Sequence, residues 1–274
     1  MDLHPVEAGQ VRGTRSQLNG RRPVALRNLW AMLDRRWAPS RPSFAWIVDH
    51  PAGHVVVDAG PVAHPADPTR WRTHYWHPHY PLAYRSRIGP DAGLRRGLEA
   101  RDLDAGDVGT VVLTHLHPDH VGALAWLEPD RVVVDRRELA FATSWRGRLL
   151  GLNPGLWPAS TPFDPVEATA PEGVEIPGIP GIRLLYTPGH THHHCSTIIE
   201  RDGPDALLAG DAVYDLDHLR TRRLDGVATR PSAARRSMDT IDDLARSRDL
   251  VVLPSHDPDG PDRLDAGAAY RPEA

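Results

Sequence analysis

The pattern of apolar and polar positions predicts short strands that alternate with helices. Apolar runs at 44–48 and 55–57 flank a Pro-Ala-Gly turn and are typical of a hairpin. Further strands are predicted at 111–113, 131–134, 182–186, 197–199, 206–208 and 250–253, and helices at 92–101, 119–127, 136–142 and 232–246. Strands and helices interleaved in two successive blocks favour a layered α/β architecture.

Three segments stand apart from this pattern. Residues 1–43 are rich in Arg and Pro, show a helical pattern only around 24–33 and no strand, and are interpreted as an arm or cap on a domain of residues 44–274. Residues 61–90 are dense in Pro, His and aromatic residues without periodicity, which predicts a lid, because long irregular loops in compact domains are commonly functional. A Pro-rich stretch at 154–180 separates the two blocks.

Composition and charge narrow the class of protein. Hydrophobic residues make up 40% and charged residues 25% of the chain, which is ordinary for a globular protein. The basic residues are scattered arginines and the formal net charge is −4, so no nucleic-acid partner is expected. One cysteine, no export signal and no apolar stretch of about 20 residues lead us to expect a cytoplasmic protein without a membrane partner.

Residues 114–120, Thr-His-Leu-His-Pro-Asp-His, follow an apolar strand and carry the strongest chemical signal. In an extended segment, side chains two apart project to the same side, so His115 and His117 can hold one metal ion. Asp119 and His120 are neighbours at a predicted helix start and aim in different directions, which makes a second ion plausible. Such a string arises by chance in well under about one chain in a hundred.

Three later blocks also place a possible ligand directly after a predicted strand. His190 follows a strand and a Pro-Gly turn, while Asp211 and His256 each follow an apolar run. Ligand sites gather at the carboxyl ends of strands in α/β sheets, so these blocks are expected to converge. The predicted metal ligands are His115, His117, Asp119, His120, His190, Asp211 and His256.

In their order, these blocks resemble the motifs of the metallo-β-lactamase superfamily over about residues 44–257, with Asp58 matching an early strand-end Asp. The resemblance implies a four-layer αββα sandwich, with two mixed sheets flanked by helices. It implies two divalent ions, and zinc suits the nitrogen-rich set, although iron, cobalt and manganese also accept His and carboxylate. The implied division is His115, His117 and His190 for one ion, Asp119, His120 and His256 for the other, and Asp211 as a bridge.

A finer resemblance points to the N-acyl-homoserine lactone hydrolases, or quorum-quenching lactonases. They carry a Tyr three residues after the bridging Asp, as Tyr214 stands here, and a repeated Thr-Pro-Gly-His that 187–194 partly matches, with His192-His193 replacing the second Pro-Gly. The implied reaction is lactone opening by a hydroxide that bridges two metals. Tyr214 would donate to the carbonyl oxygen and Asp119 would pass a proton to the departing alkoxide. A lone Tyr after a strand is also common as a packed residue.

Other functions stay open on the sequence. Another hydrolase of the same fold, acting on a small ester, thioester or phosphodiester, is the main alternative. A redox di-iron protein or a non-catalytic scaffold is a further one. The complete ligand set argues against a scaffold, and the His117, Asp119 and His120 pattern differs from the carboxylate-rich di-iron version of the motif.

Several residues receive weaker expectations. Asp58 is expected to be structural or to support the ligands, His194 resembles a supporting His of the family, and Cys195 is expected to be a small buried residue. The histidines of the predicted lid are His74, His77 and His79. Their spacing fits no standard metal site, so metal binding and ordinary hydrogen bonding are competing interpretations of their role. An apolar trough for an acyl tail could draw on Trp30, Trp37, Trp71 and Trp76.

Overall fold

The computed structural model describes residues 1–20, 26–62, 77, 79–89 and 93–272. Its strands are β1 (Asp2–Gly13), β2 (Arg41–His50), β3 (Gly53–Val57), β4 (Tyr84–Arg87), β5 (Val108–Val112), β6 (Arg131–Asp135), β7 (Phe163–Val166), β8 (Val174–Glu175), β9 (Ile182–Tyr186), β10 (Cys195–Ile199), β11 (Asp205–Gly210) and β12 (Leu250–Pro254). Its α-helices are α1 (Arg15–Leu18), α2 (Arg27–Leu33), α4 (His79–Ala83), α5 (Leu94–Glu99), α6 (Arg136–Thr143), α7 (Trp145–Leu149), α8 (Leu216–Arg220), α9 (Pro231–Ser247) and α10 (Gly260–Asp265). Short 3-10 helices are η2 (Ala105–Asp107), η3 (Gly122–Ala125) and η4 (Pro154–Leu156).

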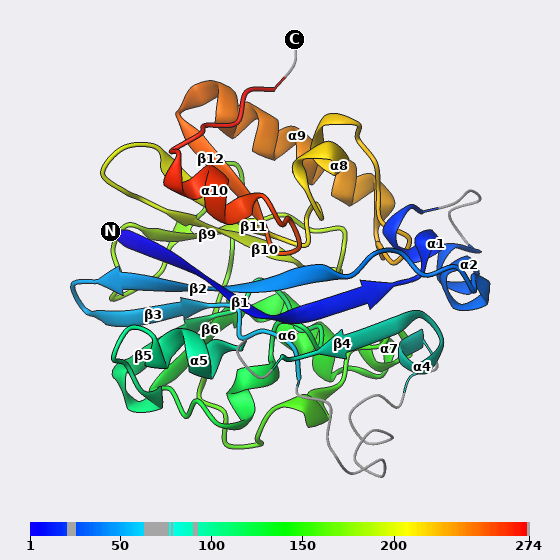
Figure 1. Ribbon diagram of the computed structural model, residues 1–274, viewed down its shortest axis with the longest axis horizontal. Helices are drawn as coiled ribbons and strands as arrows, with labels where there is room; N and C mark the ends of the chain where they lie inside the picture. Colours follow the sequence, from blue (N-terminus) through cyan, green and yellow to red (C-terminus); the bar gives the residue numbers. More distant parts are fainter. Residues whose placement is uncertain (21–25, 63–76, 78, 90–92, 273–274) are drawn as a thin grey trace.

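Two mixed sheets lie face to face, with helices on their outer sides (Figure 1). The seven-stranded sheet has the order β4-β1-β2-β3-β5-β6-β7, and the five-stranded sheet has the order β12-β11-β10-β9-β8. In the first sheet, β3, β5, β6 and β7 are parallel. In the second, only β11 and β12 pair in parallel. The predicted four-layer αββα sandwich is confirmed.

Alternation along the strands divides the apolar residues between three cores. Trp46 and Val48 of β2 face the layer between the sheets, whereas Ala45 and Ile47 face the core under α5 and α6. On β12, Val251 and Leu253 face the layer between the sheets, and its other apolar residues pack under α9. Because successive side chains of a strand point to opposite faces, each sheet is buried on both sides.

The expectation of no strand in the first forty residues is wrong. β1 pairs with β2 from Asp2 to Val11 and lies second in the large sheet. A bulge between Glu7 and Gly9 shifts the register, so the alternation of apolar residues breaks along the strand and the period-two signal is lost. The helical pattern at 24–33 corresponds to α2. The division of the chain at residue 43 stays a prediction.

The predicted helix at 119–127 is also wrong, since only the short η3 forms there. Several backbone groups of this segment bond to the loop after β3, and the bonds within the segment form only short turns. Ala59 N donates to His120 O at 2.8 Å, and Gly122 N donates to Gly60 O at 2.8 Å. A Cβ at Gly122 would meet the carbonyl oxygen of Pro61 at 2.1 Å, so only glycine permits this close approach.

Most other predicted elements are present with shifted ends. The strands expected at 111–113, 197–199 and 206–208 correspond to β5, β10 and β11, and 154–180 contains β7 and β8. Residues 63–76, which include Trp71, His74 and Trp76 of the predicted lid, lie outside the described residues. No helix in the described part of the chain is long and apolar enough to cross a bilayer.

Candidate metal centre

All the strands that lead to predicted ligands end at one edge of the sandwich. β3 and β5 are parallel neighbours in one sheet, and β11 and β12 are parallel neighbours in the other. β9 runs in the same direction as β11 because two antiparallel pairings separate them. The backbones of the two sheets also bond here, with Cys195 N donating to Thr114 O and Phe44 N to Ser255 O, each at 2.9 Å. The ligand loops therefore leave a shared, rigid edge.

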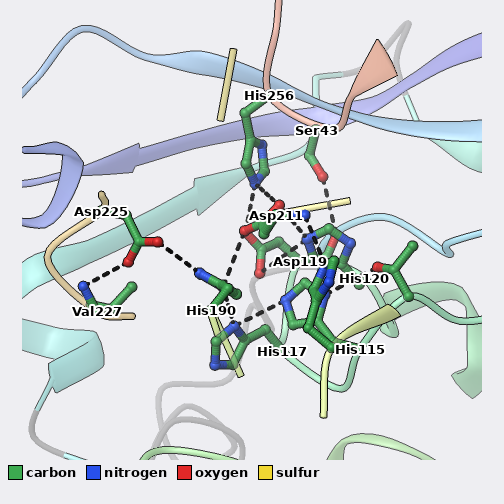
Figure 2. A network of polar contacts seen from close by, with 12 residues as sticks. Ser43, His115, His117, Asp119, His120, His190, Asp211, Asp225, Val227 and His256 are labelled. Atoms are coloured by element: carbon green, nitrogen blue, oxygen red, sulfur yellow. Dashed lines mark hydrogen bonds and ion pairs between the residues drawn. The ribbon is translucent and has the colours of Figure 1, made fainter. Parts of the chain in front are cut away.

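One group of ring nitrogens consists of His115, His117 and His190. His115 Nε2 lies 3.0 Å from His117 Nδ1, which lies 2.9 Å from His190 Nε2. Figure 2 shows these rings turned toward one another beneath Asp211. Their facing nitrogen atoms lie within 4.8 Å of one another, close enough to share one ion.

A second group consists of Asp119, His120, Asp211 and His256, and Asp211 connects it to the first. Asp211 Oδ1 lies 3.3 Å from His120 Nε2 and 3.2 Å from His256 Nε2, while its Oδ2 lies 3.3 Å from His190 Nε2. Asp119 Oδ2 lies 3.5 Å from His256 Nε2. One carboxylate thus presents one oxygen to each group, the arrangement that a bridging ligand needs.

Hydrogen bonds behind three of the rings orient the nitrogens that face the centre. His256 Nδ1 donates to the carbonyl of Pro42 at 2.8 Å, and His120 Nδ1 contacts Asp58 Oδ2 at 2.7 Å. Likewise, Nδ1 of His190 contacts Asp225 Oδ2 at 3.3 Å. An acceptor behind a ring places the proton on Nδ1, which leaves the Nε2 lone pair facing inward.

Asp58 supports both groups at once. Its carboxylate accepts the Thr114 hydroxyl at 2.9 Å, and the Thr114 oxygen lies 3.1 Å from His115 Nδ1. With the Thr114 proton directed to Asp58, its oxygen is free to accept from the ring. The same carboxylate accepts from His120, so one buried Asp behind β3 and β5 orients a ring in each group. The expected supporting role of Asp58 has this geometric basis.

Burial and charge set the protonation of the cluster. Burial, with neighbouring His120 and His190, lowers the pKa of His115 and His117 well below its usual value, so both rings are neutral. Burial opposes charge on His120 too, but the carboxylates of Asp58 and Asp211 raise its pKa well above the usual value. Burial would raise the pKa of Asp211, yet the surrounding histidines hold it well below its ordinary range.

The donor set fits metal ions better than a purely organic network. His117 Nδ1 lies 2.9–3.0 Å from both His115 Nε2 and His190 Nε2, and it carries at most one proton, so it cannot donate to both when the rear nitrogens of His115 and His190 hold their own protons. The buried His120 Nε2 and Asp211 Oδ1 have no hydrogen-bond partner within the described part of the chain. Buried polar atoms without partners are costly, and a cation at the centre would satisfy them.

Tyr214 lies beside the centre, between the two groups. Its ring centroid is 5.5 Å from the His256 ring and 5.8 Å from the His190 ring. Burial first, and then the nearby carboxylates of Asp225 and Asp211, raise the pKa of its phenol well above the usual value, so it stays a proton donor. Tyr214 and Asp119 line two adjoining cavities that open onto the centre.

The other histidines of the sequence motifs do not face the centre. His194 accepts the backbone N–H of Asp211 on Nε2 at 3.0 Å and so positions that residue. His192 stacks on Phe141 with centroids 4.1 Å apart, and His193 contacts the Tyr186 hydroxyl at 2.9 Å. These contacts assign His192 and His193 to packing and local hydrogen bonding.

The remaining weak candidates also have local partners. His77 contacts the carbonyl of Leu149 at 3.0 Å and, with His79, lines the cavity near His117. Trp37 lies under the guanidinium of Arg85, 4.8 Å from the ring centroid. Cys195 is fully buried, and burial raises the pKa of its thiol well above the usual value.

Sequence reasoning missed Asp225 and Glu138. Asp225 accepts from His190 and from Val227 N at 2.8 Å, in a loop without strand or helix periodicity. Glu138 is fully buried in α6 and accepts from His193 N at 3.1 Å. A carboxylate next to a predicted strand end was the signal used for Asp58 and Asp211, and neither of these residues has it.

The αββα sandwich thus carries at its edge two adjoining groups of buried His and Asp side chains that could hold metal ions. The model of the metallo-beta-lactamase superfamily matches residues 38–256, and the chain belongs to that superfamily. The resemblance inferred from the motifs is confirmed, and so is the expectation of a metal-dependent hydrolase.

Relatives and solved structures agree with the family. The chain is 27% identical over 218 residues to the N-acyl homoserine lactonase AttM of Rhizobium radiobacter, covering 78% of this chain and 81% of the relative. It is 29% identical over 182 residues to AiiB, an N-acyl homoserine lactonase of Rhizobium rhizogenes, covering 61% and 63%. A solved N-acyl homoserine lactone hydrolase with N-hexanoyl-L-homoserine at its catalytic metal centre matches with a TM-score of 0.74 at 19% identity, over 94% of this chain and 93% of that one. This last likeness establishes the fold.

Proposed function

We propose that the protein opens the lactone ring of N-acyl homoserine lactones at a centre of two zinc ions, and thereby quenches signals of this kind. The observation that carries the proposal is the position of Asp211, whose two oxygens face the two groups of histidines separately. The relatives AttM and AiiB, both named as N-acyl homoserine lactonases, support the substrate class.

In this proposal, His115, His117 and His190 would hold one ion, Asp119, His120 and His256 would hold the other, and Asp211 would offer one oxygen to each group. Divalent ions bound there would supply Lewis acidity and lower the pKa of bound water toward about 7. The nitrogen-rich donor set, with the rear nitrogens already engaged, suits zinc.

The side chains around the centre supply the remaining chemistry. The protonated Tyr214 hydroxyl donates to the lactone carbonyl oxygen and stabilises the negative charge that develops there. Asp119 lies at the junction of both cavities, where it would accept the proton that the attacking water loses and pass it to the ring oxygen as the C–O bond breaks. Water is added across that bond, so each turnover yields a hydroxy acid that ionises and releases one proton.

The acyl chain of the substrate has an apolar hollow available. The cavity on the Asp119, Tyr214 and His256 side has walls that include Val11, Leu18, Ala38 and Pro39. These residues come from β1, α1 and the segment before β2, so we propose that residues 1–43 serve as a cap with β1 anchored in the sheet, and 44–274 as the hydrolase domain. The single buried cysteine supports the cytoplasm as the proposed compartment.

Proton release tests the proposal directly. Purified protein loaded with zinc is mixed with N-hexanoyl and N-decanoyl homoserine lactones, and base consumption is followed at constant pH. We expect one proton for each lactone, together with two zinc ions for each chain by metal analysis. Cleavage of a thioester or a phosphodiester in the absence of lactone opening would reject the lactonase assignment while keeping the family.

A further inference from the structure

Large apolar side chains are exposed at the mouth of the cavity, on three short helices. Leu33 of α2 is 60% exposed, Leu82 of α4 is 52% exposed, and Trp145 and Leu149 of α7 are 67% and 60% exposed. Leu29, one turn before Leu33 on α2, is 43% exposed. Scattered exposed apolar residues need no explanation, but a group on adjoining helices at a site entrance does.

The three helices form one continuous rim. α2 packs against α4. α4 is tied to the end of α7, because Tyr80 donates to Gly151 O at 2.6 Å and His77 contacts Leu149 O at 3.0 Å. Figure 1 shows α2, α4 and α7 at the same end of the molecule. Residues of the same segments line the cavity, namely Asn28, Met32, His79, Tyr80, Leu150 and Gly151.

The charge of this rim is strongly positive. Residues 26–36, 79–87 and 143–151 contain seven arginines, of which all but the buried Arg27 are exposed, and one acidic residue, Asp34, in a chain whose net charge is −4. Asp34 is already paired with Arg36 at 3.0 Å. On α7, Arg146 and Arg148 are exposed beside Trp145 and Leu149, and within the described ranges neither forms an ion pair.

We propose that this rim, made of α2, α4 and α7, docks on the anionic surface of a lipid bilayer. Trp, Leu and Arg side chains side by side suit the boundary between acyl chains and headgroups, where apolar groups insert and guanidinium groups meet phosphate. The exposed apolar side chains belong to separate helices. Such separate side chains can insert into a fluid lipid layer more readily than they can pack against the rigid surface of a folded protein. The cavity then opens toward the membrane, in which acylated molecules dissolve.

A second copy of the chain fits this face poorly. In a two-fold dimer the same patch meets itself, so Arg146 and Arg148 would lie opposite arginines of the partner. Like charges at an interface cost several kcal/mol. The sequence led us to expect no membrane partner, because no segment is long and apolar enough to span a bilayer; the proposed peripheral contact departs from that expectation and requires no spanning segment.

Vesicle binding of the full chain, loaded with zinc and without substrate, tests the proposal independently of any lactonase activity. We expect sedimentation with phosphatidylcholine vesicles that contain 30% phosphatidylglycerol, weak sedimentation with pure phosphatidylcholine, and release at 0.5 M salt. R146A/R148A should lower partitioning about 30-fold, since each arginine near an anionic surface contributes about 1 kcal/mol. W145A/L149A should lower it at least about 10-fold.

A matched control is the exposed pair Arg235 and Arg236 on α9, a helix that packs on the five-stranded sheet and is not one of the three rim helices. R235A/R236A should bind vesicles as the parent does. The proposal would be overturned if R235A/R236A lost as much vesicle binding as R146A/R148A. It would also be overturned if the parent bound neutral and anionic vesicles equally, or bound no vesicles at 0.1 M salt. A dimer in sedimentation equilibrium that R146A/R148A dissociates would assign the face to a second copy instead.

Discussion

At the floor of the cavity, side chains are fixed from behind, whereas at its rim they extend into solvent. His120, His190 and His256 each have an acceptor on the nitrogen that points away from the centre. Leu33, Trp145 and Leu149 at the rim are 60–67% exposed and belong to helices of at most seven residues. The ligand side chains at the floor are therefore fixed in one arrangement, whereas the side chains at the rim are available for contact with a partner.

This difference has a physical cause in the backbone. The floor residues directly follow strands of both sheets, and all of these strands except the edge strand β12 are paired on both sides, so two sheets together determine their positions. Short helices contribute little stability of their own and depend on packing for their position. The paired strands can hold ligands in the precise positions that catalysis needs. The short helices of the rim suit contacts that must adapt to a partner.

The largest effect is expected from removing a floor ligand. H117A or D211A should release metal and reduce lactone turnover at least about 1,000-fold, because the charge stabilisation of the reaction is lost with the ions. Metal content and base consumption are measured on the same preparations. H192A, in the same motif region but stacked on Phe141, should retain both metal and activity. Full activity of metal-free D211A would contradict the proposed centre.

Next in size is the loss of the Tyr214 hydroxyl. Y214F should keep the full metal content but lower kcat about 100-fold, the scale of one lost oxyanion donor. The matched control is Y270F, since Tyr270 is also buried but donates to Asp242 on the far side of α9. Unchanged kcat in Y214F would assign Tyr214 to packing alone.

The D225A variant tests whether a hydrogen bond to the rear nitrogen of a ligand histidine strengthens metal binding. D225A should weaken binding of one zinc ion about 10- to 100-fold, because only His190 of the first group loses its acceptor. D58A should weaken both ions, since Asp58 supports a ring in each group. Zinc removal by a series of chelators of increasing affinity shows whether one site or both sites bind zinc more weakly. The exposed Asp239→Ala change should leave both affinities as they are.

Glu138 gives the floor a pH dependence. Burial raises the pKa of its carboxyl to about 7 from 4.5, so its neutral form is favoured in the fold. The neutral Glu138 carboxyl therefore contributes its full share to the stability of the fold below about pH 4.5. This contribution to the unfolding free energy is lost as the pH rises through 7. Relative to the parent, E138Q should therefore gain about 2 kcal/mol of unfolding free energy between pH 5 and 8, measured with urea. The exposed E99Q change should show no such trend.

The floor was predictable from the sequence and the rim was not. Ligands such as His190 and Asp211 directly follow apolar strands, so the pattern of strand and polar residue located them, although their metal binding stays a prediction. Asp225 lies in a loop without such a pattern, and β1 was missed because its bulge breaks the alternation. At the rim, the helical pattern at 24–33 located α2, but α4 and α7 are too short for a helical period to stand out, and the exposure of the rim residues depends on tertiary packing.

The smallest effect on folding is expected at the rim, and the matched pair Leu149 and Leu152 tests it within one segment. Leu149 is 60% exposed, whereas Leu152 is 1% exposed in the core under α5 and α6. L149A should change the unfolding free energy by less than about 0.5 kcal/mol, but L152A should cost about 2–5 kcal/mol through a cavity. Urea unfolding with zinc present measures both. A large loss in L149A would mean that the rim leucine is packed, and this face would then not be a surface built for a partner.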